Sequence, residues 1–136
     1  MNNTEQTLSI IKPDAVERNL ENDIKQMFLE NGFKIFDEKK IQIEKSEAEK
    51  FYKVHETKPF YNDLCSYLSS GPIVVMVLEK DNAVLANREL MGATNPKDAN
   101  DGTIRKRYGI SIDKNSVHGS DSIANAKIEI DFFFKN

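Results

Sequence analysis

The segment from Ile73 to Leu78 is an unbroken apolar run, Ile-Val-Val-Met-Val-Leu, which follows Gly71-Pro72 and ends at Glu79. The run is too short and too rich in β-branched residues to favour a helix. A continuous apolar run between turn residues is typical of a strand that lies inside a sheet. We therefore expect the fold to be built around a central strand at 73–78.

Other segments also have strand patterns. A β-branched run begins at Thr7 and stops at Pro13-Asp14, which predicts a strand and then a turn that leads toward a helix. From 33 to 43 the apolar residues fall at odd positions, with a polar interruption at 37–39, as expected of a half-buried strand. Lys12 is thereby placed at the end of the first strand.

Helical spacing and capping residues predict helices at 20–29, 46–54, 59–69 and 83–91, and a last helix that begins after Ser122. At the start of the second helix, Ser46 and Glu49 resemble a capping box. From Ala93 to Lys114 the chain has few apolar residues and many turn formers. A loop of that length in a compact domain is usually functional or disordered.

The order of these elements predicts the α+β fold class. Short strands alternate with short helices, which favours an antiparallel sheet covered by helices on one face, the ferredoxin-like split βαβ architecture. A length of 136 residues is that of one domain, which we expect to span 1–136.

The composition argues against several classes of protein. No apolar run approaches the roughly 20 residues that span a bilayer, so we expect no membrane partner. The polar N-terminal residues lack the pattern of a secretory signal, which favours a cytoplasmic location. One cysteine and two histidines cannot form a tetrahedral zinc site within one chain, and a net charge of -3 favours no specific nucleic-acid partner.

His118 lies in the segment Asn115-Ser116-Val117-His118-Gly119-Ser120-Asp121-Ser122, among small and hydroxyl residues. This composition is unlike that of an ordinary helix or strand and indicates a polar turn. Gly119 lets a backbone or a phosphate approach closely because it has no Cβ, and Ser120 and Asp121 can orient a ring nitrogen. A histidine in such a turn is either structural or chemical, and the rest of the chain has to decide between the two.

Lys12, Arg88 and Arg105 lie in separate segments, each next to a break in the pattern. Taken singly, each is best interpreted as a solvated surface charge. Together with Thr94 they would form a phosphate clamp, since a guanidinium matches phosphate oxygens bidentately and a lysine adds a point charge. Neither of the common Gly-rich phosphate motifs occurs, so any nucleotide would have to be held by side chains.

Further candidate side chains have alternative interpretations. Phe60 is either a core anchor of a helix or an exposed platform for a base. Tyr52 follows Phe51, and on a helix only one of the pair can face the core, so the hydroxyl makes Tyr52 the better candidate for a polar site. Glu129 is either a solvated acid or the carboxylate that fixes the tautomer of the imidazole. The other histidine, His55, is interpreted as structural or solvent-exposed.

Other chemistries are weaker. His118, Ser120 and Asp121 have the residue types of a hydrolase triad, but a serine so near the histidine in sequence seldom permits the required geometry, and no G-x-S-x-G motif occurs. The basic segment Arg105-Lys106-Arg107-Tyr108 is short and stands alone in an acidic chain, which makes it a poor nucleic-acid patch.

With these residues assembled, the sequence closely resembles the nucleoside diphosphate kinase family over nearly its whole length. The resemblance is carried by Ile11-Lys12-Pro13-Asp14-Ala15-Val16, Pro59-Phe60-Tyr61, Ser70-Gly71-Pro72, Arg88-Glu89-Leu90-Met91-Gly92-Ala93-Thr94-Asn95-Pro96, Gly102-Thr103-Ile104-Arg105, and the segment 115–122 that contains His118. Several long motifs in the family's order are a specific signal.

The resemblance implies that His118 takes the γ-phosphoryl group from a nucleoside triphosphate such as ATP and passes it to a nucleoside diphosphate, in ping-pong order and with broad base specificity. It also implies ligands for each part of the nucleotide: Lys12, Arg88, Thr94 and Arg105 for the phosphates, Lys12 and Asn115 for the ribose, and Phe60 with Ile112 opposite it for the base. Tyr52 would sit beside His118, and Glu129, helped by Ser120, would hold the far ring nitrogen.

Cofactor and assembly are implied in the same way. Mg²⁺ would be held by the nucleotide phosphates, with no metal ligand from the protein side chains. Family members are homo-oligomers, and the resemblance favours a hexamer over the alternative tetramer. Aromatic residues at 132–134 on a terminal helix cannot all face one core, which fits a subunit contact.

The chain departs from the family pattern at Lys106-Arg107, where Gly-Asp is usual, and at Asp113-Lys114, where Gly-Arg is usual. Neither change removes an implied ligand. We expect backbone strain at Asp113 and a weaker ion pair at Lys114. The alternative from another class is a nucleotide- or nucleic-acid-binding module that keeps the fold without the chemistry, and the presence of His118 together with every implied ligand favours the kinase.

Overall fold

A four-stranded antiparallel sheet lies at the centre of the computed structural model, which describes residues 4–134. Its strands are β1 (Thr4–Ile11), β2 (Lys34–Ile41), β3 (Ile73–Asp81) and β4 (Val117–Gly119), in the order β2-β3-β1-β4. The apolar run at 73–78 therefore forms an internal strand, as predicted. Since β1 and β2 are both antiparallel to β3, which separates them, the sheet has the predicted split βαβ topology.

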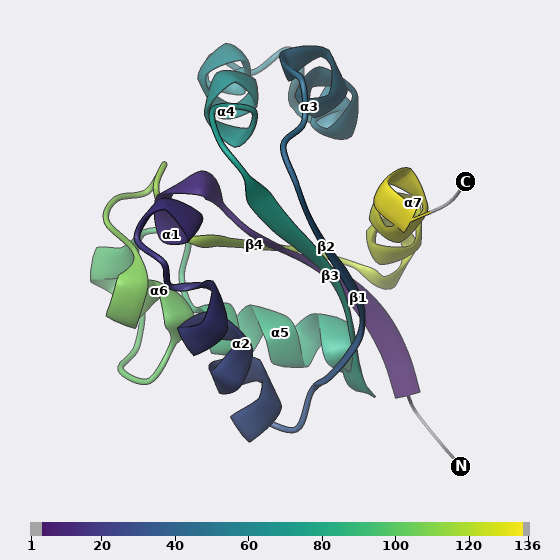
Figure 1. Ribbon diagram of the computed structural model, residues 1–136, viewed down its shortest axis with the longest axis vertical. Coiled ribbons are helices and arrows are strands. Elements are labelled where there is room, and N and C mark those ends of the chain that lie inside the picture. Colours follow the sequence, from purple (N-terminus) through teal and green to yellow (C-terminus); the bar gives the residue numbers. More distant parts are fainter. Residues whose placement is uncertain (1–3, 135–136) are drawn as a thin grey trace.

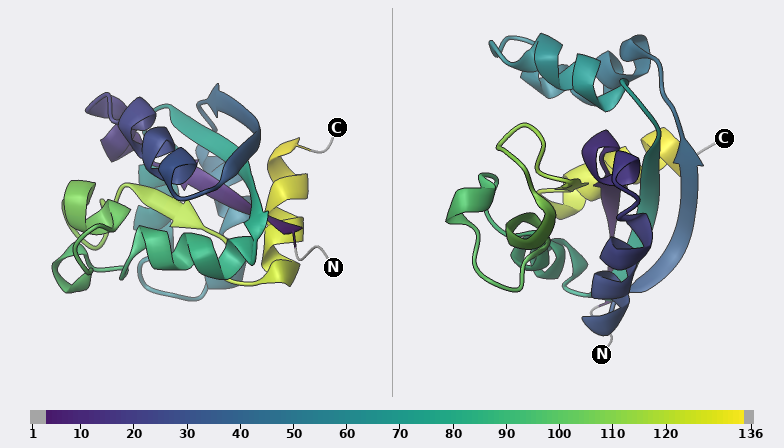
Figure 2. Two further views of the ribbon diagram at one scale, coloured as in Figure 1. Left: turned by 90° about the horizontal axis from the view of Figure 1, so that it is seen from below. Right: turned by 60° about the vertical axis from the view of Figure 1, so that its left-hand side comes forward.

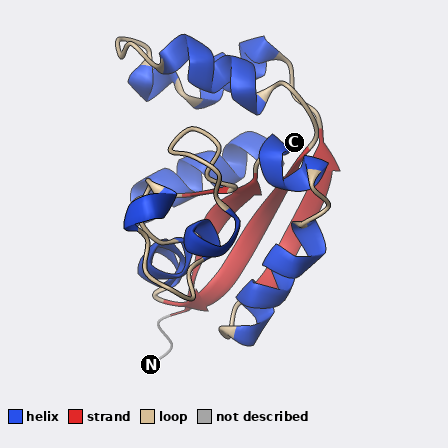
Figure 3. Cartoon of the chain, turned by 90° about the vertical axis from the view of Figure 1, so that its left-hand side faces the viewer, coloured by secondary structure: helices blue, strands red, loops and turns tan. Residues whose placement is uncertain are grey.

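Helices pack around this sheet (Figure 1). They are α1 (Pro13–Glu17), α2 (Glu21–Glu30), α3 (Lys45–Phe51), α4 (Tyr61–Leu68), α5 (Ala83–Met91), α6 (Ile104–Tyr108) and α7 (Ile123–Phe134), with 3-10 turns η1 (Lys53–His55) and η2 (Pro96–Asp98). The pair α3 and α4 lies beyond one end of the sheet, which Figure 3 shows from the side. Within residues 4–134, none of the helices has the length and apolar character that a membrane crossing requires.

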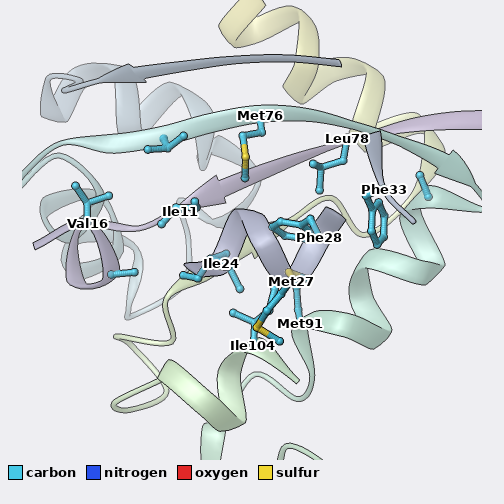
Figure 4. Packing of buried hydrophobic residues seen from close by; sticks show 14 residues of the cluster. Ile11, Val16, Ile24, Met27, Phe28, Phe33, Met76, Leu78, Met91 and Ile104 are labelled. Atoms are coloured by element: carbon cyan, nitrogen blue, oxygen red, sulfur yellow. The ribbon is translucent and has the colours of Figure 1, made fainter. Parts of the chain in front are cut away.

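Both faces of the sheet are covered, so the expectation of a single covered face is wrong. Alternate residues of the strands point to opposite sides, and a hydrophobic cluster lies on each. One cluster joins β1 and β3 to α1, α2 and α5, with Phe28 and Met76 near its middle (Figure 4). The other joins Leu8, Ile10 and Val75 to α3, α4 and α7. A strand that is apolar at every position has to be buried on both sides.

Local structure differs from the sequence prediction at several points. The capping box belongs to Glu44 and Glu47 rather than to Ser46 and Glu49, so α3 begins one residue before Ser46. The predicted loop at 93–114 contains η2 and α6. His118 lies on strand β4 and not in a turn, because three residues there pair with the end of β1. Figure 2 shows β4 at the edge of the sheet.

The aromatic run at the C-terminal end packs mostly within its own chain. Phe133 is buried in the cluster under α7, and Phe134 packs against that cluster. Phe132 is partly exposed, but its ring contacts Phe51 and Phe133. The run therefore provides only a weak argument for a subunit contact.

Candidate active site

His118 is oriented by a carboxylate from the last helix. Its Nε2 lies 2.9 Å from Oε1 of Glu129, and the Oγ of Ser120 donates to the same oxygen at 2.9 Å. Because a carboxylate accepts, the imidazole donates through Nε2–H and keeps a lone pair on Nδ1. The side chain of His118 is 21% exposed, which leaves it accessible from solvent. This ring has the tautomer and the access that a nucleophile needs.

The strand pairing decides to which face of the sheet the imidazole of His118 points. His118 lies opposite Ile10 of β1, so its side chain points to the face that α7 covers. Ser120 is tied to the same strand: its backbone N–H donates to the carbonyl of Leu8, and its Oγ accepts from the N–H of Leu8 at 3.4 Å. The sheet and α7 thus place the imidazole and its carboxylate independently.

Aromatic rings line the other sides of the imidazole. The ring centroid of Phe51 lies 5.3 Å from that of His118, and the centroid of Tyr52 lies 6.3 Å away, both edge to face. The expectation that only one of the pair faces the core is wrong: Tyr52, the C-cap of α3, is buried in a hydrophobic cluster, and Phe51, the last residue of α3, packs against the same cluster. Tyr52 is only 5% exposed, and its burial raises the pKa of the phenol above its usual range. Its hydroxyl therefore stays protonated.

Hydrogen bonds link Lys12, at the end of β1, to the segment just before β4. Lys12 Nζ donates to Oδ1 of Asn115 at 2.9 Å, and Nδ2 of Asn115 donates to the carbonyl of Thr94 at 3.0 Å. The Lys12 side chain is buried, whereas Thr94 is exposed. The structure thus brings three of the predicted ligands together.

The cations are placed close enough to disfavour each other's charge. Arg105 is buried at the start of α6 and donates to the carbonyls of Gly92 and Val117, while Arg88 is exposed on the last turn of α5. Burial, with a contribution from Arg88, lowers the pKa of Arg105 to about 10. Burial, with a contribution from Arg105, lowers the pKa of Lys12 to about 8. Crowded, desolvated cations favour the binding of an anion between them.

Phe60 lies at the start of α4 and is 46% exposed. It lines a pocket together with Tyr67 of α4 and with Asp113 and Lys114 of the loop opposite. Figure 2 shows that loop rising toward α4. Ile112 is 54% exposed in the same loop but is not among the residues that line the pocket. Because nearly half of Phe60 is exposed, the interpretation of Phe60 as a core anchor is wrong.

The backbone strain expected at Asp113 is found instead at another residue of this segment. Among residues 4–134, the non-glycine residues with positive φ are Asn19, Asn82 and Ser116, and Asp113 is not one of them. Ser116 has φ of 75° and is fully buried directly before β4. The left-handed turn that positions this segment therefore lies at Ser116.

Some residues of the site were not predicted from the sequence. His55, interpreted as structural or exposed, lines the pocket of His118 together with Phe51 and Asp121. Helical spacing contains a signal for His55, because it follows Tyr52 by three positions and lies on the same side. Asp121 is exposed in that pocket, and its Oδ1 accepts from Asn125 at 2.6 Å.

The two pockets differ in size. The pocket beside His118 has a volume of about 170 Å³, below the roughly 300 Å³ at which sites for drug-sized ligands start, whereas the pocket beside Phe60, at about 300 Å³, reaches that limit. Fold and site together define an α+β protein equipped for nucleophilic transfer of an anionic group at a histidine.

Comparison with known proteins identifies the family. The family model for nucleoside diphosphate kinase matches residues 5–136. Nucleoside diphosphate kinases of Campylobacter jejuni and of a Nitratiruptor species are each 59% identical, and the alignments cover 96% of this chain and 96% and 95% of those proteins. This chain therefore belongs to the nucleoside diphosphate kinase family.

Solved structures agree with this assignment. The nucleoside diphosphate kinase of Aquifex aeolicus superposes with a TM-score of 0.96 at 38% identity, over 98% of this chain and 96% of that one. The enzyme of Encephalitozoon cuniculi superposes with a TM-score of 0.93 at 37% identity, over 97% and 90% of the two chains. These structures confirm the α+β, ferredoxin-like fold class. Nucleotide kinases of this family generally need a divalent cation.

Proposed function

We propose that His118 carries the phosphoryl group in the transfer reaction of this family. Nδ1 attacks the γ-phosphorus of a nucleoside triphosphate, the Nδ1–P bond forms, and the bond from phosphorus to the β,γ-bridging oxygen breaks. The nucleoside diphosphate leaves, and a second diphosphate takes the group by the reverse reaction. The observation that carries this proposal is the hydrogen bond from Nε2–H to Glu129, which leaves the Nδ1 lone pair free.

The phosphates would be bound by the crowded cations. Lys12, Arg88 and Arg105 lie on different elements, and an anion between them would offset the burial and, secondarily, the repulsion that lower the pKa values of Lys12 and Arg105. Thr94 adds an exposed hydroxyl beside Asn115. These groups stabilise the charge on the transferring phosphoryl group without any covalent step of their own.

The nucleoside would be held loosely at the base and more firmly at the sugar. The exposed ring of Phe60 provides a stacking surface, with Ile112 of the opposite loop as the second wall. Every base has a π face, so stacking permits broad base specificity. Lys12 and Asn115, joined to each other by a hydrogen bond, would bind the ribose hydroxyls.

Mg²⁺ held by the nucleotide phosphates is the proposed cofactor, as the family resemblance implies. Within residues 4–134, no group of three His, Cys, Asp or Glu side chains is arranged to bind a metal. Glu129 is engaged by His118 and Ser120, whereas the carboxylate of Asp121 is exposed in the same pocket. Mg²⁺ prefers oxygen ligands and keeps its waters, and when bound it neutralises phosphate charge. Asp121 is the side chain we propose to face it.

Two further proposals concern location and assembly. The cytoplasm is the proposed location, where nucleoside triphosphates are available. The second is a homo-oligomer, with a hexamer favoured over a tetramer by the family resemblance. Exposed apolar side chains such as Phe36 on β2 and Leu29 on α2 support a subunit contact. Light scattering coupled to size-exclusion chromatography would measure the assembly directly.

Steady-state kinetics test the proposed reaction. Initial rates of transfer from a nucleoside triphosphate to a diphosphate with a different base should give parallel lines in double-reciprocal plots. A His118→Asn variant should lose transfer, whereas Ser66→Ala on the exposed side of α4 should keep it. Intersecting lines, or normal transfer by His118→Asn, would contradict the proposal.

A further inference from the structure

The carboxylate of Asp14 is buried behind the candidate nucleotide site. Asp14 lies in α1, two residues after Lys12, and is 5% exposed. Its Oδ1 accepts a hydrogen bond from the hydroxyl of Tyr67. Its Oδ2 accepts from Oγ of Ser116 at 3.0 Å and from the guanidinium of Arg18 at 3.1 Å. A buried carboxylate is tolerated only with such partners, and two of them, Tyr67 and Ser116, come from distant parts of the chain.

Each partner belongs to a different part of the nucleotide site. Tyr67 lies on α4 and lines the same pocket as Phe60. Ser116 lies between Asn115 and β4. The NH2 group of Arg18 also donates to the carbonyl of Tyr108, at the end of α6, the helix that carries Arg105. Asp14 thus connects the elements that carry the proposed base, ribose and phosphate ligands.

Ser116 has an unfavourable backbone conformation that its hydrogen bonds hold in place. Its φ of 75° is unfavourable for a residue with a Cβ, and it persists only where the surroundings enforce it. Its hydroxyl is held by Asp14, and its carbonyl accepts from the N–H of Lys12 at 2.8 Å. Because Asn115 precedes Ser116, this turn sets the direction of the Asn115 amide, which bonds to Lys12 and Thr94.

The protonation of Tyr67 suits this arrangement. Burial, together with the hydrogen bond to Asp14, raises the pKa of its phenol above the usual range. The hydroxyl therefore remains a donor to the carboxylate, and it also accepts from the backbone N–H of Asp14 at 2.9 Å. The bond between α4 and α1 is thus reciprocal.

We propose that Asp14 is a positioning residue, which holds Phe60, Asn115 and Lys12 in one relative geometry so that a nucleotide can contact all of them together. Asp14 itself does not touch the nucleotide. The inference rests on the proposed roles of Phe60, Asn115 and Lys12 in nucleotide binding. It predicts that loss of Asp14 weakens nucleotide binding while the chemistry of the His118 ring is preserved.

The experiment separates nucleotide binding from phosphorylation of the imidazole. Asp14→Asn and Tyr67→Phe are compared with wild type for the KM of a nucleoside diphosphate and for phosphorylation by phosphoramidate, which needs no nucleoside site. We expect Asp14→Asn to raise KM about tenfold or more, and Tyr67→Phe to raise it less, because misplaced binding groups lose much of their effect. Phosphorylation by phosphoramidate should stay within about twofold of wild type if the imidazole is undisturbed.

Tyr61→Phe is the matched control. Tyr61 is on the same helix, but its hydroxyl donates to the carbonyl of Glu49 and not to Asp14, so the KM should not change. An unchanged KM in Asp14→Asn would overturn the inference, and so would a parallel loss of phosphoramidate reactivity. If Asp14→Asn does not fold, Tyr67→Phe alone decides by the same criteria.

An Asn115→Ala variant distinguishes the two levels of the argument. A raised KM in Asn115→Ala with a normal KM in Asp14→Asn would refute only the positioning role of Asp14. A normal KM in Asn115→Ala would refute the proposed nucleotide site on which that role depends.

Discussion

Glu129 on α7 and His118 on β4 are joined by a hydrogen bond of 2.9 Å between Oε1 and Nε2. The two residues lie on separate elements, and each element is anchored in the core by its own contacts. The imidazole therefore has its tautomer and its direction fixed before any substrate arrives. A nucleophile that is oriented in advance avoids reorganisation during the reaction.

Replacement of Glu129 by Gln should lower kcat about 10- to 100-fold, because a neutral amide orients the imidazole less firmly and stabilises its positive charge less. The KM for nucleotides should change little, since Glu129 contacts no proposed nucleotide ligand. Ser120→Ala should have a smaller effect, because it removes only a supporting bond to the same Oε1. Equal kcat values for wild type and Glu129→Gln, measured under saturating substrate, would refute this role.

The pH dependence of phosphate binding should report on Lys12. Its pKa is lowered to about 8, so the ammonium is mostly charged at pH 7 and loses its charge as pH rises through 8. The value of kcat/KM should therefore fall on the alkaline side, beginning near pH 8. A Lys12→Arg variant should be less active at pH 7 but should lack this fall, because a guanidinium stays charged. A wild-type profile that is flat from pH 7 to 10 would contradict the assignment.

Phe60→Ala should raise the KM for every nucleoside diphosphate about 10- to 100-fold, which corresponds to the roughly 1–3 kcal/mol that stacking on one base contributes. The rise should be similar for purines and pyrimidines if stacking alone binds the base. Leu85→Ala is the control, since Leu85 is an exposed apolar side chain on α5 outside both pockets. A loss confined to one base would indicate specific recognition and would contradict broad specificity.

The sequence predicted the longer elements well, because their patterns are local. The apolar run of β3 and the spacing of α2 and α5 need no knowledge of distant residues. Strand β4 was expected in the order of elements but was not located, because Val117, His118 and Gly119 are too few to show a period and form a strand only through pairing with β1. The burial of both sheet faces likewise depends on where α7 folds back.

The sequence predicted which residues make up the candidate site, but not the residues that hold them in position. His118, Lys12 and Asn115 stand in motifs that the family resemblance identified, and the structure joins Lys12 to Asn115 by a hydrogen bond. The left-handed turn at Ser116 and its bond to Asp14 were not predictable, because serine carries no sequence signal for positive φ. The place of His55 beside the pocket of His118 was not predicted, because a histidine at a helix end is ordinarily exposed, whereas here the turn after α3 brings it to the pocket.

Gly119→Ala should destabilise the protein by about 1–3 kcal/mol, the usual cost of an overpacked core. A Cβ at that position would overlap the amide of Asn87 and lie 2.8 Å from Cε of Met91, both on α5. Gly71→Ala is the matched control, because its Cβ would meet only Pro13 at an ordinary 3.7 Å. Urea denaturation of the two variants measures the difference.

The Asn87→Ala change should recover part of the stability of Gly119→Ala, since it removes the amide that the new methyl group meets. A double-mutant cycle quantifies this recovery. Additive effects of the two changes would show that the contact between Asn87 and position 119 is not the cause.

The central claim is that His118 carries the phosphoryl group. The chain has two histidines, so the claim can be tested with few variants. The protein is incubated with ATP and Mg²⁺ without an acceptor, and its intact mass is measured before and after mild acid treatment. The account predicts one acid-labile phosphoryl group per chain in wild type and in His55→Asn, and none in His118→Asn. A phosphoryl adduct that persists in His118→Asn, or one that resists acid, would contradict it.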